Sequence, residues 1–184
     1  MSEPPIKTLA TINDVDHSYE LLMSEDDIKS FVALANQQKE ICFDTETTSI
    51  NPLEAELVAV AFSWEKGKGY LIHFPESRDE TIKILNILKP IFENELITKV
   101  GQNIKFDIQV LANYDIEVKG ALFDTMLAHY LLEPDQRHNM NVLAEKYLSY
   151  SPIPIESLIG EKGSGQKSMR NVSANKLQIG RAHV

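Results

Sequence analysis

Residues 40–74, EICFDTETTSINPLEAELVAVAFSWEKGKGYLIHF in one-letter code, contain the pattern that decides the fold. Three short apolar runs, Glu40 to Glu46, Leu57 to Trp64 and Gly69 to Phe74, are bounded by polar residues, and Gly67-Lys68-Gly69 separates the last two. Short apolar runs punctuated by turn residues are typical of consecutive strands. We therefore predict three strands here, the later two forming a hairpin.

Helical patterns lie on both sides of these strands. Before them, Ser24 and Asp27 resemble a capping box ahead of apolar residues at helical spacing, which predicts a helix from Ser24 to about Gln38. A strand meander followed by strands alternating with helices implies an α/β fold with a mixed central sheet flanked by helices. The later predicted elements are a helix over Asp79–Phe92 with Pro90 in its last turn, a short strand at Ile97–Val100, a helix from near Asn103, and helices over Asp124–Leu132 and Asn141–Tyr147.

One principal domain, residues 21–171, is expected, with a short segment at each end. Residues 1–20 include two adjacent prolines and show no clear period, so we predict an arm or linker. Residues 172–184 show little periodicity, and we expect a tail that is disordered or foreign to the natural protein.

The composition excludes several classes of protein. A formal net charge of −9 argues against a free-standing domain that captures nucleic acid by general electrostatics, because neutralising phosphates requires clustered Lys and Arg. The single cysteine, Cys42, cannot form an internal disulfide, which fits a reducing compartment. No apolar run approaches the roughly 20 residues that span a bilayer, and the N-terminus lacks a signal-peptide pattern, so we expect a cytoplasmic protein without a membrane partner.

Two carboxylates, Asp44 and Glu46, stand at the end of the first predicted strand. Residues i and i+2 of a strand point to the same face, so the two side chains are expected to project together. Neighbouring carboxylates repel each other unless a cation shares them, and Mg²⁺ or Mn²⁺ suits an oxygen-only site. The alternative, a solvated strand end with two unrelated acids, is favoured for an isolated Asp-x-Glu pattern.

A third acid, Asp107, lies four residues after Asn103 on the same face of a predicted helix and has apolar neighbours. Spacing alone does not decide whether such an acid is functional or merely exposed.

Five segments together form an ordered set that is far more specific than Asp-x-Glu alone. The segments are Phe43 to Thr47, Val100 to Asp107, Gly120 to Leu127, Arg137 to Met140 and Leu143 to Glu145. In this order they resemble the proofreading exonuclease domain of family-A bacterial DNA polymerases, within the DEDD exonuclease superfamily. The likeness covers roughly Leu21 to Arg170 and implies a ribonuclease H-like fold.

The resemblance implies an enzyme that hydrolyses the terminal phosphodiester at the 3′ end of single-stranded DNA and releases nucleoside 5′-monophosphates. Asp44, Glu46 and Asp107 match three of the four acids that hold two divalent metal ions, Mg²⁺ or Mn²⁺, in that family. The polymerase domain of the same parent chain is the implied partner.

Four further residues match positions that the family uses for the single-stranded 3′ end. Thr47 matches a small residue near the terminal sugar, Ile50 an apolar wedge beside the last base, and Asn103 an amide for the backbone. Phe106 matches a position that is often aromatic, and for this residue alone we prefer core packing to a functional role.

Two polar residues have structural interpretations. Asp124 matches a Phe-Asp-Thr motif near a helix start, where an aspartate caps the helix. His138 is expected to be a hydrogen-bonded residue of a loop or helix start rather than a catalyst.

The family completes its site with a tyrosine and, four residues later, an aspartate on a C-terminal helix. Those positions fall near Gly180 and Val184, and no Tyr, Asp or Glu follows Glu161. Three explanations are open: the sequence ends early in unrelated residues, the natural domain has lost the motif, or the alignment of the tail is incorrect. The poor periodicity of Ala174 to Val184 favours the first. We expect hydrolysis orders of magnitude slower than in a domain with the full motif.

Two other functions compete with a nuclease of this type. One is a silent exonuclease-like scaffold that only supports an attached polymerase, although retained carboxylates argue against it. The other is an RNA-trimming enzyme of the ribonuclease D type, which shares the carboxylate scheme.

Overall fold

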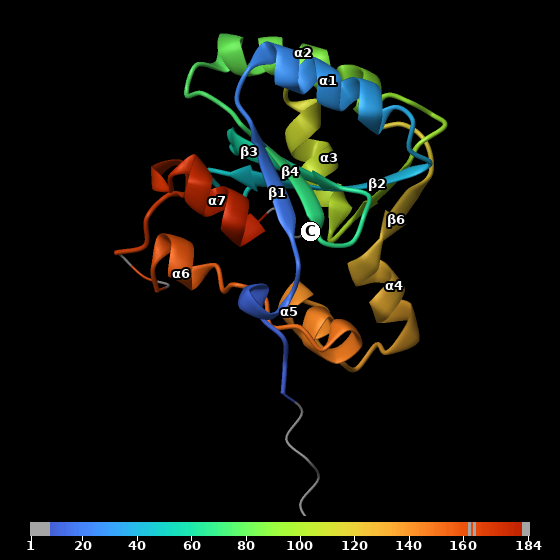
Figure 1. Cartoon of the computed structure of the whole chain (residues 1–184), viewed down its shortest axis with the longest axis vertical. Helices are drawn as coiled ribbons and strands as arrows, with labels where there is room; N and C mark the ends of the chain where they lie inside the picture. Colours follow the sequence, from blue (N-terminus) through green and yellow to red (C-terminus); the bar gives the residue numbers. More distant parts are fainter. Residues whose placement is uncertain (1–7, 162, 164, 182–184) are drawn as a thin grey trace, which may run out of the picture.

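A six-stranded mixed sheet with helices on both sides forms the core of the computed structural model, which describes residues 8–161, 163 and 165–181 (Figure 1). The strands are β1 (Ser18–Leu22), β2 (Glu40–Thr47), β3 (Leu57–Ser63), β4 (Lys68–His73), β5 (Thr98–Gly101) and β6 (Leu122–Asp124). The α-helices are α1 (Glu25–Ala35), α2 (Arg78–Phe92), α3 (Ile104–Ala112), α4 (Thr125–Leu132), α5 (Met140–Leu143), α6 (Glu156–Ile159) and α7 (Ala174–Arg181). Short helical turns are η1 (Ile12–Asp14), η2 (Ala144–Leu148) and η3 (Met169–Asn171).

The strand order in the sheet is β1-β4-β3-β2-β5-β6. Strands β2, β3 and β4 pair antiparallel, as predicted for the meander, and the last two form the hairpin. Strand β5 runs parallel to β2 and β6 runs parallel to β5. The predicted mixed sheet, antiparallel in its meander and parallel beyond it, is confirmed.

The two faces of the sheet are covered by different helices. Helices α1 and α2 lie side by side over one face, and together with α3 they bury the larger core (Figure 1). Aromatic rings fill this core, with Phe43 packed edge-on against Phe92 at a centroid distance of 5.3 Å and Phe31 tilted against Phe62 at 5.1 Å. The other face packs a smaller cluster, in which Leu177 of α7 is fully buried against strand residues.

Local hydrogen bonds define where α1 begins. The Ser24 hydroxyl accepts a hydrogen bond from the Asp27 N–H at 3.1 Å, and the Asp27 carboxylate accepts one from the Ser24 N–H at 3.0 Å. This capping box satisfies two N–H groups that the first turn leaves unpaired. The predicted helix start is confirmed, and the helix ends at Ala35, before the predicted Gln38.

Both ends of the described chain are more ordered than the sequence predicts. Residues 1–20 were expected to be an arm, whereas Ser18–Leu22 is a strand that pairs parallel to β4, with Leu21 opposite Leu71. Residues 172–184 were expected to be a tail that is disordered or foreign to the natural protein, whereas Ala174–Arg181 is helical. In both cases distant partners supply what the local sequence lacks, namely the hydrogen bonds of β4 and the apolar cluster around Leu177.

Among the residues that the structure describes, no helix combines the length and the apolar character needed to cross a bilayer.

Candidate active site at the end of strand β2

Asp44 and Glu46 lie near the C-terminal end of β2 and share one face of the sheet. In the β2–β3 ladder Asp44 is opposite Ala61 and Glu46 is opposite Ala59, and both alanines belong to the smaller core cluster. Residues directly opposite each other in a ladder lie on the same face. The prediction that the two carboxylates project together is confirmed, with Glu46 buried and Asp44 half-buried.

Asp107 reaches the same strand from α3. It is only 2% exposed, and its Oδ1 accepts hydrogen bonds from the Thr45 N–H at 2.8 Å and the Thr45 hydroxyl at 2.6 Å. Pairing of β2 with β5 ends at Cys42 opposite Val100, so the carboxylate provides an acceptor beyond the point where β5 stops. The structure therefore brings all three predicted acids to the three-residue stretch Asp44–Glu46, with Asp107 bonded to its middle residue.

The three acids do not approach the strand from the same side. Thr45 is opposite Val60, which belongs to the larger core, so its side chain lies on the face opposite to Asp44 and Glu46. Asp107 bonds this threonine from the α3 side. Sequence spacing alone could not show this, because it does not specify which face of the sheet the helix covers.

Electrostatic effects nevertheless link the three carboxylates. The pKa of Asp107 is raised to about 6, mainly by burial and to a smaller extent by the charge of Glu46, against the hydrogen bonds from Thr45, which lower it. Burial also raises the pKa of the Cys42 thiol to about 12, with additional contributions from the charges of Asp44 and Asp107. Negative charge is thus concentrated around the end of β2, where a cation would relieve it.

The donors at this strand end suit a hard divalent ion, because they are carboxylate oxygens in a crowded, largely buried setting. Across residues 8–161, 163 and 165–181, however, no three His, Cys, Asp or Glu side chains are gathered closely enough to form a metal-binding group. The chemistry of the donors therefore fits a metal site, while Asp107 is held at Thr45 instead of beside the other two acids.

The predicted substrate-binding residues occupy three settings. Ile50 lies in the loop after β2 and is 96% exposed, and Thr47 is half-buried, with its hydroxyl donating to the Ser49 carbonyl at 2.9 Å. Asn103 precedes α3 with a positive φ of 56°. Phe106 is half-buried against the larger core, in agreement with the packing interpretation.

Asp124 caps two helices at once. Its Oδ1 accepts hydrogen bonds from the N–H groups of Met126 at 2.8 Å and Leu127 at 3.2 Å, which confirms the predicted cap of α4. The same carboxylate also accepts from the N–H groups of Asn103 at 3.1 Å and Ile104 at 3.0 Å, at the start of α3. The second cap has no local sequence signal, since it results from the β5–β6 register that places Gly101 opposite Asp124.

A mostly apolar cavity of about 400 Å³ lies beside β2 and β5 and is bordered by α4, α5 and η2. Cys42, Phe123 and His129 are among its lining residues. The His129 ring contacts that of His138 through their Nδ1 atoms at 2.7 Å, and the His138 carbonyl accepts from the Gln102 side chain at 2.6 Å. His138 is thus a hydrogen-bonded loop residue, as predicted, and the cavity borders several segments that carry the sequence resemblance.

Comparison with known proteins gives a family for this fold and site. Residues 19–173 match the model of a family described as a 3′-5′ exonuclease. DNA polymerase I of Pseudomonas aeruginosa is 34% identical over 84% of this chain, and that of Synechocystis sp. is 38% identical over 63%. The chain spans only 18% and 13% of the lengths of these relatives.

Solved structures confirm the fold at lower identity. Ribonuclease D of Escherichia coli, an exoribonuclease, is 17% identical with a TM-score of 0.67, over 91% of this chain and 41% of that one. A Mg²⁺-bound structure of Brucella melitensis NrnC is 20% identical with a TM-score of 0.65, over 92% and 75%. The predicted ribonuclease H-like arrangement is therefore the observed one.

Proposed function

This chain belongs to the 3′-5′ exonuclease family that is represented in bacterial DNA polymerase I, and from that premise we propose that it trims the 3′ ends of single-stranded DNA. The observation that carries the proposal is the strand end at which Asp44 and Glu46 share a face and Asp107 bonds the intervening Thr45. In the proposed reaction water attacks the terminal phosphorus, the bond to the 3′ oxygen breaks, and that oxygen takes a proton. The products are a nucleoside 5′-monophosphate and a strand one nucleotide shorter.

Asp44, Glu46 and Asp107 are the proposed ligands of two divalent ions, Mg²⁺ or Mn²⁺. When bound, such ions supply a water of lowered pKa and stabilise negative charge on the leaving oxygen. The protein's own part is to hold Asp44 and Glu46 on one face of β2 and Asp107 at Thr45 on the α3 side. Asp107 would have to leave Thr45 to share an ion with the other two acids.

Residues around this strand end are proposed to bind the 3′-terminal nucleotides. Ile50 projects from its loop with 96% of its surface exposed, which suits an apolar contact with a base. Thr47 is the last residue of β2, and Asn103 offers its amide at the start of α3. Phe106 is assigned to packing, because it contacts the larger core.

The proposed partner is the polymerase portion of the same parent chain, since the matched relatives are several times longer than this chain. A tethered polymerase would deliver the DNA end to a domain whose net charge of −9 gives it little general attraction for phosphates. A cytoplasmic location is part of the same proposal.

Activity is expected to be low, because no Tyr, Asp or Glu after Glu161 can supply the family's third motif. That feature also favours the second candidate, a silent scaffold that keeps the fold without the chemistry. Metal binding separates the two, since a scaffold has no reason to bind the ions.

The test combines calorimetry with Mn²⁺ and cleavage of a 5′-labelled single-stranded DNA. We expect at least one bound ion and slow Mn²⁺-dependent shortening of the DNA from its 3′ end. Asp44→Asn should lower both the affinity for Mn²⁺ and the rate of shortening by at least about tenfold. Glu40→Gln, an exposed acid at the opposite end of β2, is the matched control and should change neither.

A version extended by a helix with Tyr-x-x-x-Asp should cleave orders of magnitude faster. If neither form binds Mn²⁺ through Asp44, the scaffold function is correct, and if single-stranded RNA is shortened faster than DNA, the ribonuclease D type is correct.

A further inference from the structure

The loop between β2 and β3, residues 48–56, is closed at its base by two hydrogen bonds between Thr48 and Glu56. The Thr48 N–H donates to the Glu56 carbonyl at 3.0 Å, and the Glu56 N–H donates to the Thr48 hydroxyl at 3.0 Å. The ladder shifts register by one residue between Glu46 and Thr47, just before this loop. The exposed Ile50 lies within the loop that these two hydrogen bonds close.

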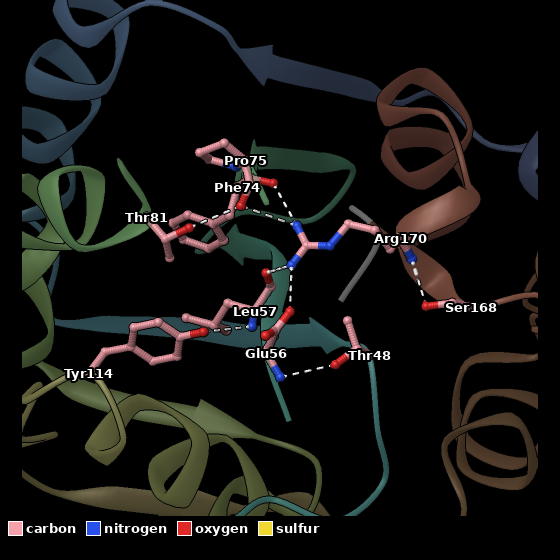
Figure 2. A network of polar contacts seen from close by, with 9 residues as sticks. All are labelled: Thr48, Glu56, Leu57, Phe74, Pro75, Thr81, Tyr114, Ser168 and Arg170. Atoms are coloured by element: carbon pink, nitrogen blue, oxygen red, sulfur yellow. Dashed lines mark hydrogen bonds and ion pairs between the residues drawn. The ribbon is translucent and has the colours of Figure 1, made fainter. Parts of the chain in front are cut away.

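Arg170, from the distant turn η3, holds the β3 side of this base (Figure 2). One guanidinium nitrogen donates to the Leu57 carbonyl at 2.8 Å and lies 3.7 Å from the Glu56 carboxylate. The other donates to the carbonyls of Phe74 at 3.0 Å and Pro75 at 3.2 Å, directly after β4. The side chain is 13% exposed, so a largely buried cation ties the start of β3 to the end of β4.

Leu57 is held from its other side as well. Its N–H donates to the Tyr114 hydroxyl at 3.1 Å (Figure 2). The Arg78 guanidinium in turn lies 4.3 Å from the centre of the Tyr114 ring. The neighbouring Asn113 donates from its side chain to the Pro52 carbonyl at 2.7 Å, within the loop itself. The first residue of β3 is thus fixed at its N–H by Tyr114 and at its carbonyl by Arg170.

We propose that Arg170 is a positioning residue for the exonuclease site, which fixes the base of loop 48–56 and so the place of Ile50 beside the carboxylates of β2. This inference rests on the proposed function, in which Ile50 contacts the 3′-terminal base. A guanidinium suits the role because its rigid fork of five donors can serve several carbonyls at once, which the single ammonium group of a lysine cannot reproduce.

Small displacements of a substrate-contacting group are costly, since an error of about 1 Å can lower a rate by about 100-fold. Arg170 is separated from Leu57 by 113 residues, and its guanidinium bonds the carbonyls of Leu57, Phe74 and Pro75. Its proposed influence on the reaction therefore passes through the base of the loop.

The test is a double-mutant cycle between Arg170→Met and Ile50→Ala, measured as KM and kcat for a single-stranded DNA oligonucleotide with Mn²⁺. Ile50→Ala alone should raise KM by about tenfold, and in the Arg170→Met background it should change KM by less than about twofold, because the loop is already displaced. Arg170→Lys keeps the charge and one carbonyl contact, so the effect of Ile50→Ala on KM in this background should lie between its effects in the unchanged protein and in Arg170→Met. An intermediate effect in this milder variant would not be expected if Arg170→Met acted simply by unfolding the protein.

Hydrogen exchange supplies the readout that does not depend on activity. The amides of Thr48, Glu56 and Leu57 should exchange at least about tenfold faster in Arg170→Met than in the unchanged protein. Lys68→Met, which removes an exposed positive charge at the hairpin turn, is the matched control and should leave these amides and KM unchanged.

Additive effects of the two substitutions on KM, or unchanged exchange at these amides, would overturn the positioning role while leaving the exonuclease function in place. A protein that neither binds nor cleaves the oligonucleotide would overturn the proposed function, and the positioning role with it.

Discussion

At the scale of single residues, Asp107 shows how the fold tolerates an unfavourable group. Its carboxyl group is 2% exposed, yet it has a pKa near 6 and is therefore mostly charged at neutral pH. The two hydrogen bonds from Thr45 compensate only part of the cost of burial. An acid that weakens the fold at neutral pH is typical of a functional site.

This arrangement predicts how stability depends on pH. The folded pKa of Asp107, about 6, lies above its ordinary value of 3.8, so the folded state binds more protons between these values. The contribution of the protonated carboxyl is fully present below about pH 4 and is lost as the pH rises through 6. Asp107→Asn keeps an oxygen acceptor for Thr45 and carries no charge, so it should remove this dependence.

We expect Asp107→Asn to stabilise the metal-free protein at pH 7 by about 1 to 3 kcal/mol and to have little effect at pH 4. Urea unfolding in EDTA at the two pH values measures the difference. Asp135→Asn, an exposed aspartate after α4, serves as the comparison and should show no such contrast. Equal stability changes at both pH values would show that Asp107 does not carry this pH dependence.

At the scale of elements, Asp124 couples the starts of α3 and α4. It accepts hydrogen bonds from two N–H groups of each helix, and α3 carries Asp107. One carboxylate thus orients the helix that presents an acid to β2 and also begins the helix that borders the cavity. A helix start that lacks its own side-chain cap, as at Asn103, depends on such a remote partner.

Asp124→Ala should lower the free energy of unfolding by about 2 to 4 kcal/mol, because it removes two caps worth about 1 to 2 kcal/mol each. Asp124→Asn should have a smaller effect, since its remaining oxygen can still accept while its amide cannot. Urea unfolding gives the totals, and hydrogen exchange should show faster exchange at the starts of both α3 and α4.

Asp26→Ala is the matched control, since it removes another aspartate from the first turn of a helix. It should lower the free energy of unfolding by well under half as much as Asp124→Ala. Faster exchange confined to α4 would show that the second cap is unimportant.

At the scale of the whole molecule, exposed apolar side chains are concentrated on one part of the surface. Of the fourteen large hydrophobic residues exposed in the described chain, eight fall between residues 122 and 148, on β6, α4 and η2. Apolar surface gathered in this way is typical of an interaction site rather than of a surface that remains in water. The eight are Leu122, Phe123, Leu127, Tyr130, Leu131, Leu132, Tyr147 and Leu148.

This surface predicts weak self-association of the isolated chain. Sedimentation velocity should show a concentration-dependent increase in the sedimentation coefficient, and the combined change Leu131→Ser with Leu148→Ser should remove it. Leu53→Ser with Leu96→Ser, two leucines of similar exposure elsewhere in the fold, should leave it unchanged. Association that persists in the first variant would place the contact on another surface.

The sequence by itself determined the strand meander, the positions of most helices, the start of α1 and the shared face of Asp44 and Glu46. These features depend on periodicity and on hydrogen bonds between residues a few positions apart, so local patterns are sufficient to predict them. It also identified Asp124 as a helix cap, because an aspartate at the start of an apolar helical pattern has a local role.

Only the tertiary structure decided which distant groups meet. Strand β1 forms because β4 offers it a partner, Asp107 bonds Thr45 across 62 residues, and Arg170 reaches Leu57 across 113. Each of these contacts depends on the order of strands in the sheet and on which face a helix covers. Local patterns do not contain that information, because strand order and helix placement are set by the packing of the whole chain around its core.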